Sequence, residues 1–125
     1  MALNIATFDK NGQPIKIEIT FGYAQAGAYT LYLWDAGGKN KVKLGEGMNT
    51  DNIPDVYILD KPLANYNGKI VDGIIDVIAP NPGEGEKYNV TLSVKQGDNE
   101  IGRESDEGDL SAKTVRVRLA IKLAC

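Results

Sequence analysis

The side chains that most often carry out nucleophilic and acid–base chemistry are nearly absent from this sequence. There is no His, and the single Cys is Cys125 at the last position. A Ser–His–Asp or Cys–His site therefore cannot form within one chain. None of the three Ser lies in a Gly-x-Ser-x-Gly motif. Paired carboxylates are the remaining option, as in a glycosidase, so a small carboxylate-based hydrolase is the catalytic alternative. We therefore expect that this protein is not an enzyme.

Acidic side chains are densest between Glu104 and Asp109, where the sequence reads Glu-Ser-Asp-Glu-Gly-Asp. Calcium takes about six to eight oxygen ligands, which acidic surface loops supply. Asp106 and Asp109 are the candidate calcium ligands, and the segment 49–55 with Asp51 and Asp55 is a second oxygen-rich stretch. Neither has the alternating spacing of a known calcium loop. The preferred interpretation is a solvated acidic loop and no cofactor.

Two aromatic side chains, Tyr32 and Trp34, lie two positions apart in an apolar segment and would share one face of a strand. Leu31 and Leu33 would share the other face. If the Leu face is buried, Tyr32 and Trp34 form an exposed platform for a sugar ring or a protein partner. The preferred interpretation is a central strand covered on both faces, with Trp34 in the core, because immunoglobulin-like sandwiches bury one Trp.

A basic stripe follows the end of the chain, where Arg116, Arg118 and Lys122 alternate with apolar residues. Side chains on one face of a strand lie ~7 Å apart, so this stripe could contact an anionic partner. The preferred interpretation is cross-strand pairing with acids such as Glu18. Nucleic acid is disfavoured as a partner, because 14 basic residues stand against 17 acidic ones and the net charge is −3.

Alternation of apolar and polar residues predicts the strands that position these side chains. It is clearest over 15–21, 88–95 and 114–123, and weaker over 3–8, 28–34, 41–44, 56–59, 69–79 and around Ile101. The residues that should then be buried are Ile17, Ile19, Phe21, Val90, Leu92, Val117, Leu119 and Ile121. Asn11-Gly12 predicts a hairpin between the first two strands, and 35–40 and 96–99 are predicted turns.

This pattern predicts one all-β domain over 1–125, an antiparallel β-sandwich of about eight or nine strands, immunoglobulin-like or jelly-roll. No apolar stretch approaches the ~20 residues of a membrane helix. The first ten residues do not read as a signal peptide, so a cytoplasmic location is the default expectation, with a mature exported form as the alternative.

The segment Tyr88-Asn89-Val90-Thr91-Leu92-Ser93-Val94 resembles the penultimate strand of bacterial immunoglobulin-like modules, including the polycystic-kidney-disease-type repeat. Trp34-Asp35-Ala36-Gly37-Gly38 is similar to the Trp-Asp-x-Gly turn of that repeat, although here the two segments are further apart than in the compact repeat. The resemblance implies a sandwich fold and the role of a spacer or adhesion domain. It implies no functional residue.

The leading hypothesis is therefore a non-catalytic binding or assembly module that acts through protein–protein contacts, including self-association. Its uncharged first strand over 3–8 should pair either within the chain or with a neighbouring subunit. In the second case, deleting residues 1–8 would convert an oligomer into a monomer. The rival hypothesis is a carbohydrate-binding module that uses Tyr32 and Trp34.

Overall fold

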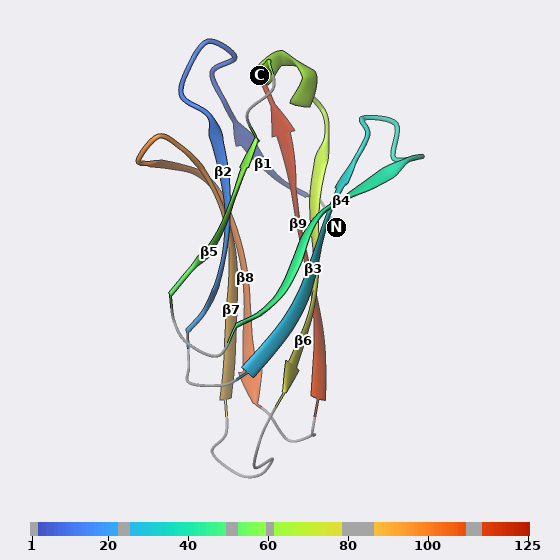
Figure 1. The fold of residues 1–125 in the computed structure, drawn as a ribbon, viewed down its shortest axis with the longest axis vertical. Coiled ribbons are helices and arrows are strands. Elements are labelled where there is room, and N and C mark those ends of the chain that lie inside the picture. Colours follow the sequence, from blue (N-terminus) through green and yellow to red (C-terminus); the bar gives the residue numbers. More distant parts are fainter. Residues whose placement is uncertain (1–2, 23–25, 50–52, 60–61, 79–86, 110–113) are drawn as a thin grey trace.

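The computed structural model describes residues 3–22, 26–49, 53–59, 62–78, 87–109 and 114–125. Nine strands form two packed sheets, so the predicted β-sandwich is confirmed (Figure 1). The five-stranded sheet has the order β1 (Asn4–Thr7), β9 (Thr114–Ala124), β6 (Ile70–Ile78), β3 (Ala26–Trp34) and β4 (Lys41–Asn49). The four-stranded sheet has the order β5 (Asp55–Leu59), β2 (Ile15–Phe21), β7 (Lys87–Gln96) and β8 (Asn99–Asp109).

The core lies between the two sheets and is built from the inward side chains of each alternating strand. All eight residues predicted to be buried are buried, and Phe21, Leu92 and Ile121 have no exposed surface. A short 3₁₀ helix, η1 (Leu63–Tyr66), adds Leu63 and Tyr66 to this core. No helix in the described part of the chain has the length and hydropathy needed to span a membrane.

The first strand does not form the predicted hairpin with the second. β1 pairs in parallel with β9, and β2 pairs with β5 and β7 in the other sheet. The turn at Asn11-Gly12 therefore belongs to a connection that crosses between the sheets. The Gln96 side chain holds this connection, since its Oε1 accepts from the Asp9 N–H at 2.9 Å and its Nε2 donates to the Gln13 carbonyl at 2.9 Å.

The acidic run that we expected to be a loop is part of β8, an eleven-residue strand. Its Cα register with β7 extends from Gln96↔Asn99 to Lys87↔Asp109, with one irregularity between Val94 and Lys95. β8 is an edge strand with mostly exposed side chains, so backbone pairing rather than apolar alternation maintains it. This places β7 third from the end of the chain, not penultimate as the immunoglobulin-like resemblance implied.

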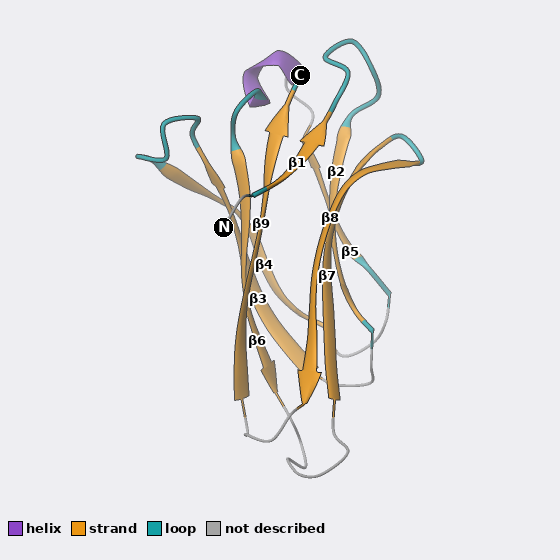
Figure 2. Cartoon of the chain, turned by 180° about the vertical axis from the view of Figure 1, so that it is seen from behind, coloured by secondary structure: helices purple, strands orange, loops and turns teal. Residues whose placement is uncertain are grey.

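Different contacts join the two sheets at the two sides of the sandwich, where their edge strands meet. On one side β1 lies against β8 as well as β9, and Asn4 Nδ2 donates to the Arg103 carbonyl at 2.9 Å (Figure 2). On the other side, where β4 faces β5, the Tyr29 hydroxyl donates to Asp55 Oδ2 at 2.6 Å and lies 2.7 Å from the Tyr57 hydroxyl. Burial, followed by these two neighbours, raises the pKa of Tyr29.

Candidate functional site

The candidate site lies on the outer face of the five-stranded sheet, the face turned away from the core. Its side chains come from alternate positions of four strands: Thr30, Tyr32, Trp34, Lys41, Lys43, Glu46, Met48, Ile70, Asp72, Ile74, Asp76, Ile78, Arg116, Arg118, Ala120 and Lys122. Trp34 is half-buried there and lies outside the core, so the preferred interpretation of a core Trp is wrong. The physical reason is that, within the described residues, no second layer covers this face.

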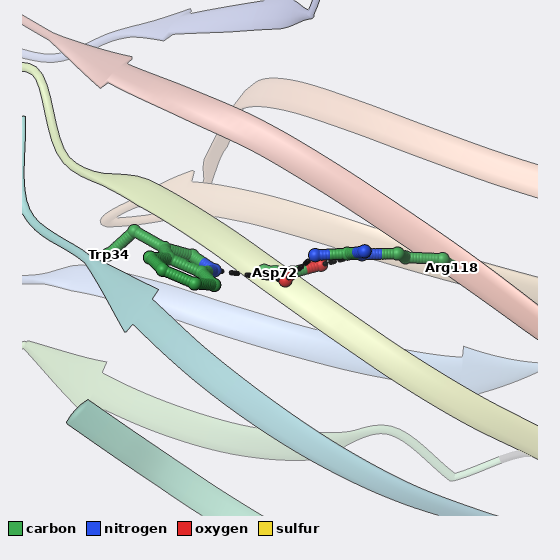
Figure 3. A network of polar contacts seen from close by, with 3 residues as sticks. All are labelled: Trp34, Asp72 and Arg118. Atoms are coloured by element: carbon green, nitrogen blue, oxygen red, sulfur yellow. Dashed lines mark hydrogen bonds and ion pairs between the residues drawn. The ribbon is translucent and has the colours of Figure 1, made fainter. Parts of the chain in front are cut away.

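Trp34 and Arg118 are both held by one buried carboxylate, Asp72 (Figure 3). Trp34 Nε1 donates to Asp72 Oδ2 at 3.0 Å. Arg118 donates through Nε to Oδ1 at 3.0 Å and through Nη2 to Oδ2 at 2.7 Å. The Asp72 side chain is 3% exposed, whereas that of Arg118 is 64% exposed. The carboxylate is therefore an anchor, and the indole and the guanidinium are the groups presented to solvent.

The electrostatics of Asp72 follow from these partners. Burial raises the pKa of the Asp72 carboxyl, but hydrogen bonds from Arg118 and Trp34 and the positive charges of Arg118 and Lys41 outweigh it, so the pKa lies below its usual value. Asp72 is therefore ionised at neutral pH. Asp72 lies in the strand predicted over 69–79, but the sequence pattern assigned it no role in the site. The signal was an Asp at two alternate outward positions of β6, Asp72 and Asp76, among isoleucines.

The basic stripe is largely engaged in cross-strand ion pairs, as preferred, but with different acids from the one we named. Arg116 binds Asp76 with Nε at 2.8 Å and Nη2 at 3.0 Å, next to the Arg118–Asp72 pair. Glu18 lies in the other sheet and pairs with Lys95 at 3.0 Å. Lys122 points to the same outer face and has no carboxylate partner within the described ranges.

Lys41 covers the two aromatic rings of the predicted platform. Its Nζ lies 4.3 Å from the centroid of the Tyr32 ring and 5.3 Å from that of Trp34. Both distances are within the range of cation–π attraction. Tyr32 and Trp34 are thus brought together on one face, as predicted, and a ligand that stacks on both rings would have to displace Lys41.

A shallow groove of about 530 Å³ runs across this face beside Trp34. Its lining includes Leu3, Trp34, Ile70, Asp72, Glu104, Arg118 and Ala120. Ala120 is the nearest register neighbour of Asp72 on β9, and its small side chain leaves room between Trp34 and Leu3. The groove therefore combines an apolar floor with one fixed indole, one fixed guanidinium and the carboxylate of Glu104, which accepts a hydrogen bond from Asn4 Nδ2. Chemically, the indole favours apolar groups and the guanidinium favours acidic ones.

The two predicted calcium ligands are not brought together. Asp106 and Asp109 are three positions apart on β8, so they point to opposite faces of the strand. Asp106 Oδ2 accepts a hydrogen bond from the Tyr88 hydroxyl at 3.2 Å. In the second oxygen-rich stretch, Asp55 is engaged by Tyr29, and Asp51 lies outside the described residues. Among the described side chains, no group of three or more acids or Cys could hold a metal ion.

Comparison with known proteins adds no relative: no protein-family model, no curated protein and no solved structure matches the chain. The candidate site therefore rests on the geometry above.

Proposed function

We propose that this chain is a non-catalytic binding module that docks another protein on the outer face of its five-stranded sheet. The observation that carries the proposal is the fixed pair Trp34 and Arg118, both hydrogen-bonded to buried Asp72. Trp, Tyr and Arg are the residues most enriched among interface hot spots. Side chains already held in place lose little conformational entropy on binding, which raises affinity.

The surroundings of this pair support a protein partner. The solvent face of an antiparallel sheet is normally polar. Here the outward positions of β6 are Ile70, Ile74 and Ile78 alternating with two Asp that are neutralised by Arg. Ile5 on β1 and Met48 on β4 add further apolar surface, and these two residues are 58% and 65% exposed. Apolar side chains are thus interspersed with paired charges across this face, which is less polar than the usual solvent face of a sheet.

The charged side chains of the outer face indicate which kind of partner segment it would bind. The outer-face acids Glu46, Asp72 and Asp76 are each paired with a cation. Lys122 has no carboxylate partner among the described residues, and Lys41 forms no ion pair there, although its charge acts on Asp72. The face is therefore locally positive, although the whole chain carries −3. We infer a partner segment that combines apolar side chains with acidic ones.

Selection of peptides from a random display library on the full chain tests this proposal. We expect enriched peptides with Asp or Glu beside large apolar residues, and weaker binding by Arg118→Ala and Ile74→Lys. Arg103→Ala on β8 is the matched control, because it removes an exposed Arg from the other sheet and should leave binding unchanged. Peptides that bind the native chain and all three variants equally would rule out this face as the docking surface.

Carbohydrate binding is the second candidate, because Tyr32 and Trp34 lie side by side under one Lys. A glycan array probed with the native chain and with Lys41→Ala separates the two candidates. If sugars stack on the rings, Lys41→Ala should bind them more tightly and Trp34→Ala should not bind. An array without hits for the native chain and for Lys41→Ala would eliminate this candidate.

A further inference from the structure

The two sheets of the sandwich end in four edge strands, β1 and β4 in one sheet and β5 and β8 in the other. An edge strand exposes unpaired backbone N–H and C=O groups that can pair with another chain. Monomeric proteins protect such edges with charges, Pro, bulges, short strands or a covering segment. The edges of this chain differ in how far they are protected.

Three of the four edges carry such protection. β4 has Lys41, Lys43 and Glu46 along it and a register irregularity at Leu31/Tyr32 of its partner β3. β8 carries many charged side chains, and Asn4 donates to its Arg103 carbonyl. β1 has four residues and lies between β9 and β8. Each therefore disfavours pairing with an added strand.

Within the described residues, β5 has less protection, since its contacts with the opposite sheet are made by the inward side chains of Asp55 and Tyr57. It reads Asp-Val-Tyr-Ile-Leu over 55–59, and its register with β2 is continuous. Its one charged side chain, Asp55, is held by the Tyr29 hydroxyl. The outward residues Val56 and Ile58 are 48% and 57% exposed. Both are β-branched residues, which pack well in paired strands.

We propose that β5 pairs with β5 of a second copy of this chain, antiparallel about a two-fold axis at Tyr57, to give one eight-stranded sheet across the dimer. In this arrangement Val56 lies opposite Ile58 of the partner copy, and Ile58 lies opposite its Val56. Both cross-strand pairs are apolar and β-branched, and the interface is the same patch on each copy, as two-fold symmetry requires.

Charges on the neighbouring strand favour this arrangement over a parallel one. Lys16 is the register partner of Ile58, and Glu18 is the register partner of Val56. In the antiparallel dimer, a row of register partners that runs across the interface contains Lys16 and Ile58 of one copy and Val56 and Glu18 of the other. Each such row therefore carries one Lys16 and one Glu18. In a parallel, in-register pairing one row would carry two Lys and another would carry two Glu. The self-complementary pattern is the reason to identify a second copy, rather than an unrelated strand, as the occupant.

This inference goes beyond the docking face proposed above and does not depend on it, since β5 belongs to the other sheet. The pairing segment has only five residues. Such a small interface forms weak dimers, so association should depend on concentration. Light scattering of the native chain should give a molar mass that rises from 13.5 kDa toward twice that value with concentration.

Charged substitutions on β5 make the test specific. Ile58→Lys and Val56→Glu should each raise the dimer dissociation constant about tenfold or more, because a charge on an edge strand opposes pairing. The double variant Val56→Glu/Ile58→Lys should restore dimerisation, because each Lys then lies opposite a Glu of the partner copy. Val42→Lys on β4 is the control, since Val42 is 69% exposed and lies outside the proposed interface.

Hydrogen–deuterium exchange of the native chain provides a readout that needs no variant, because the β5 amides should exchange more slowly as concentration rises. A native chain that stays monomeric up to about 1 mM, a dimer unaffected by Ile58→Lys, or a double variant that stays dissociated would each overturn the proposal. Peptide binding at Trp34 and Arg118 would be unaffected by such a result.

Discussion

Asp72 on β6 and Arg118 on β9 are joined by two hydrogen bonds, although they do not lie opposite each other in the sheet. The register partner of Asp72 is Ala120, and that of Arg118 is Ile74. The ion pair is therefore diagonal, whereas Asp76 and Arg116 are direct register partners. The diagonal leaves the small side chain of Ala120 beside Asp72, which opens the groove next to Trp34.

Replacing Asp72 by Asn should destabilise the protein and loosen Trp34. A hydrogen bond to a charged group contributes about 1.5–3 kcal/mol, so we expect the free energy of unfolding to fall by about that amount. Urea denaturation followed by the fluorescence of the single Trp measures this loss, and the folded-state emission should shift to longer wavelength. The control is Asp76→Asn, where the ion pair is more exposed and the loss should stay below about 1 kcal/mol. Equal losses in the two variants would contradict the anchoring role of Asp72.

Acid should remove the contribution of Asp72. Its folded-state pKa is lowered below its usual value, so the stability it contributes is present above the unfolded-state pKa of about 3.9. That contribution is lost as pH falls through the folded-state pKa. The free energy of unfolding of the native chain should therefore approach that of Asp72→Asn as pH falls below about 4. A difference between the two proteins that stays constant from pH 7 to about 2 would show that the ionised carboxylate is not the source.

Core substitutions should have the largest effect on stability. Leu92 has no exposed surface and Leu119 is 4% exposed, on strands of different sheets. Leu92→Ala and Leu119→Ala should each reduce the free energy of unfolding by about 2–5 kcal/mol, because they remove buried surface and leave a cavity. Chemical denaturation monitored by circular dichroism measures this free energy of unfolding. As a control, Val42→Ala on β4, where Val42 is 69% exposed, should change this free energy by about 0.5 kcal/mol or less.

The sequence predicted most of the fold because burial of one face imposes a visible alternation on a strand. This holds for β2, β7 and β9. It did not hold for β8, whose side chains are mostly exposed, so that Glu104 to Asp109 resembled a loop. Likewise, the parallel pairing of β1 with β9 depends on contacts between the two ends of the chain, and local turn signals such as Asn11-Gly12 contain no information about them.

The candidate site was predicted only in part. Tyr32, Trp34 and Arg118 could be placed on strand faces by counting alternate positions, but the faces themselves could not be assigned to core or solvent. Asp72 gained its role only when β3, β6 and β9 were placed side by side in register. Which carboxylate pairs with which Arg is a property of that register, and so our expectation that Glu18 would pair with the basic stripe was wrong.

Calcium should not stabilise the protein through β8. Asp106 and Asp109 point to opposite faces of the strand, so they cannot share one ion. Adding calcium should leave the melting temperature unchanged in a thermal scan. A ligand at 100 times its dissociation constant would contribute about 2.7 kcal/mol, which such a scan detects. A rise of several degrees that disappears in the variant with Asp106→Asn and Asp109→Asn would contradict this prediction.

Removing residues 1–8 should destabilise the chain and promote association, because β1 pairs within the chain and not, as in the alternative we considered, with a neighbouring subunit. β1 covers the outer edge of β9, and Ala6, which is fully buried, fits against Gly102 of β8. A Cβ added at Gly102 would lie 2.6 Å from the Ala6 Cβ, so Gly102→Ala should displace β1 at a cost of about 1–3 kcal/mol.

Light scattering and thermal denaturation test these expected changes in association and stability. Both are applied to the full chain, to a chain of residues 9–125 and to the Gly102→Ala variant. The shortened chain should melt earlier and show a higher molar mass, because the exposed edge of β9 can pair with other copies. Gly37→Ala, in an exposed turn where the nearest atom to the added Cβ is 3.7 Å away, should match the native chain. A shortened chain that is both monomeric and as stable as the native protein would mean that β1 contributes nothing to closing the sandwich.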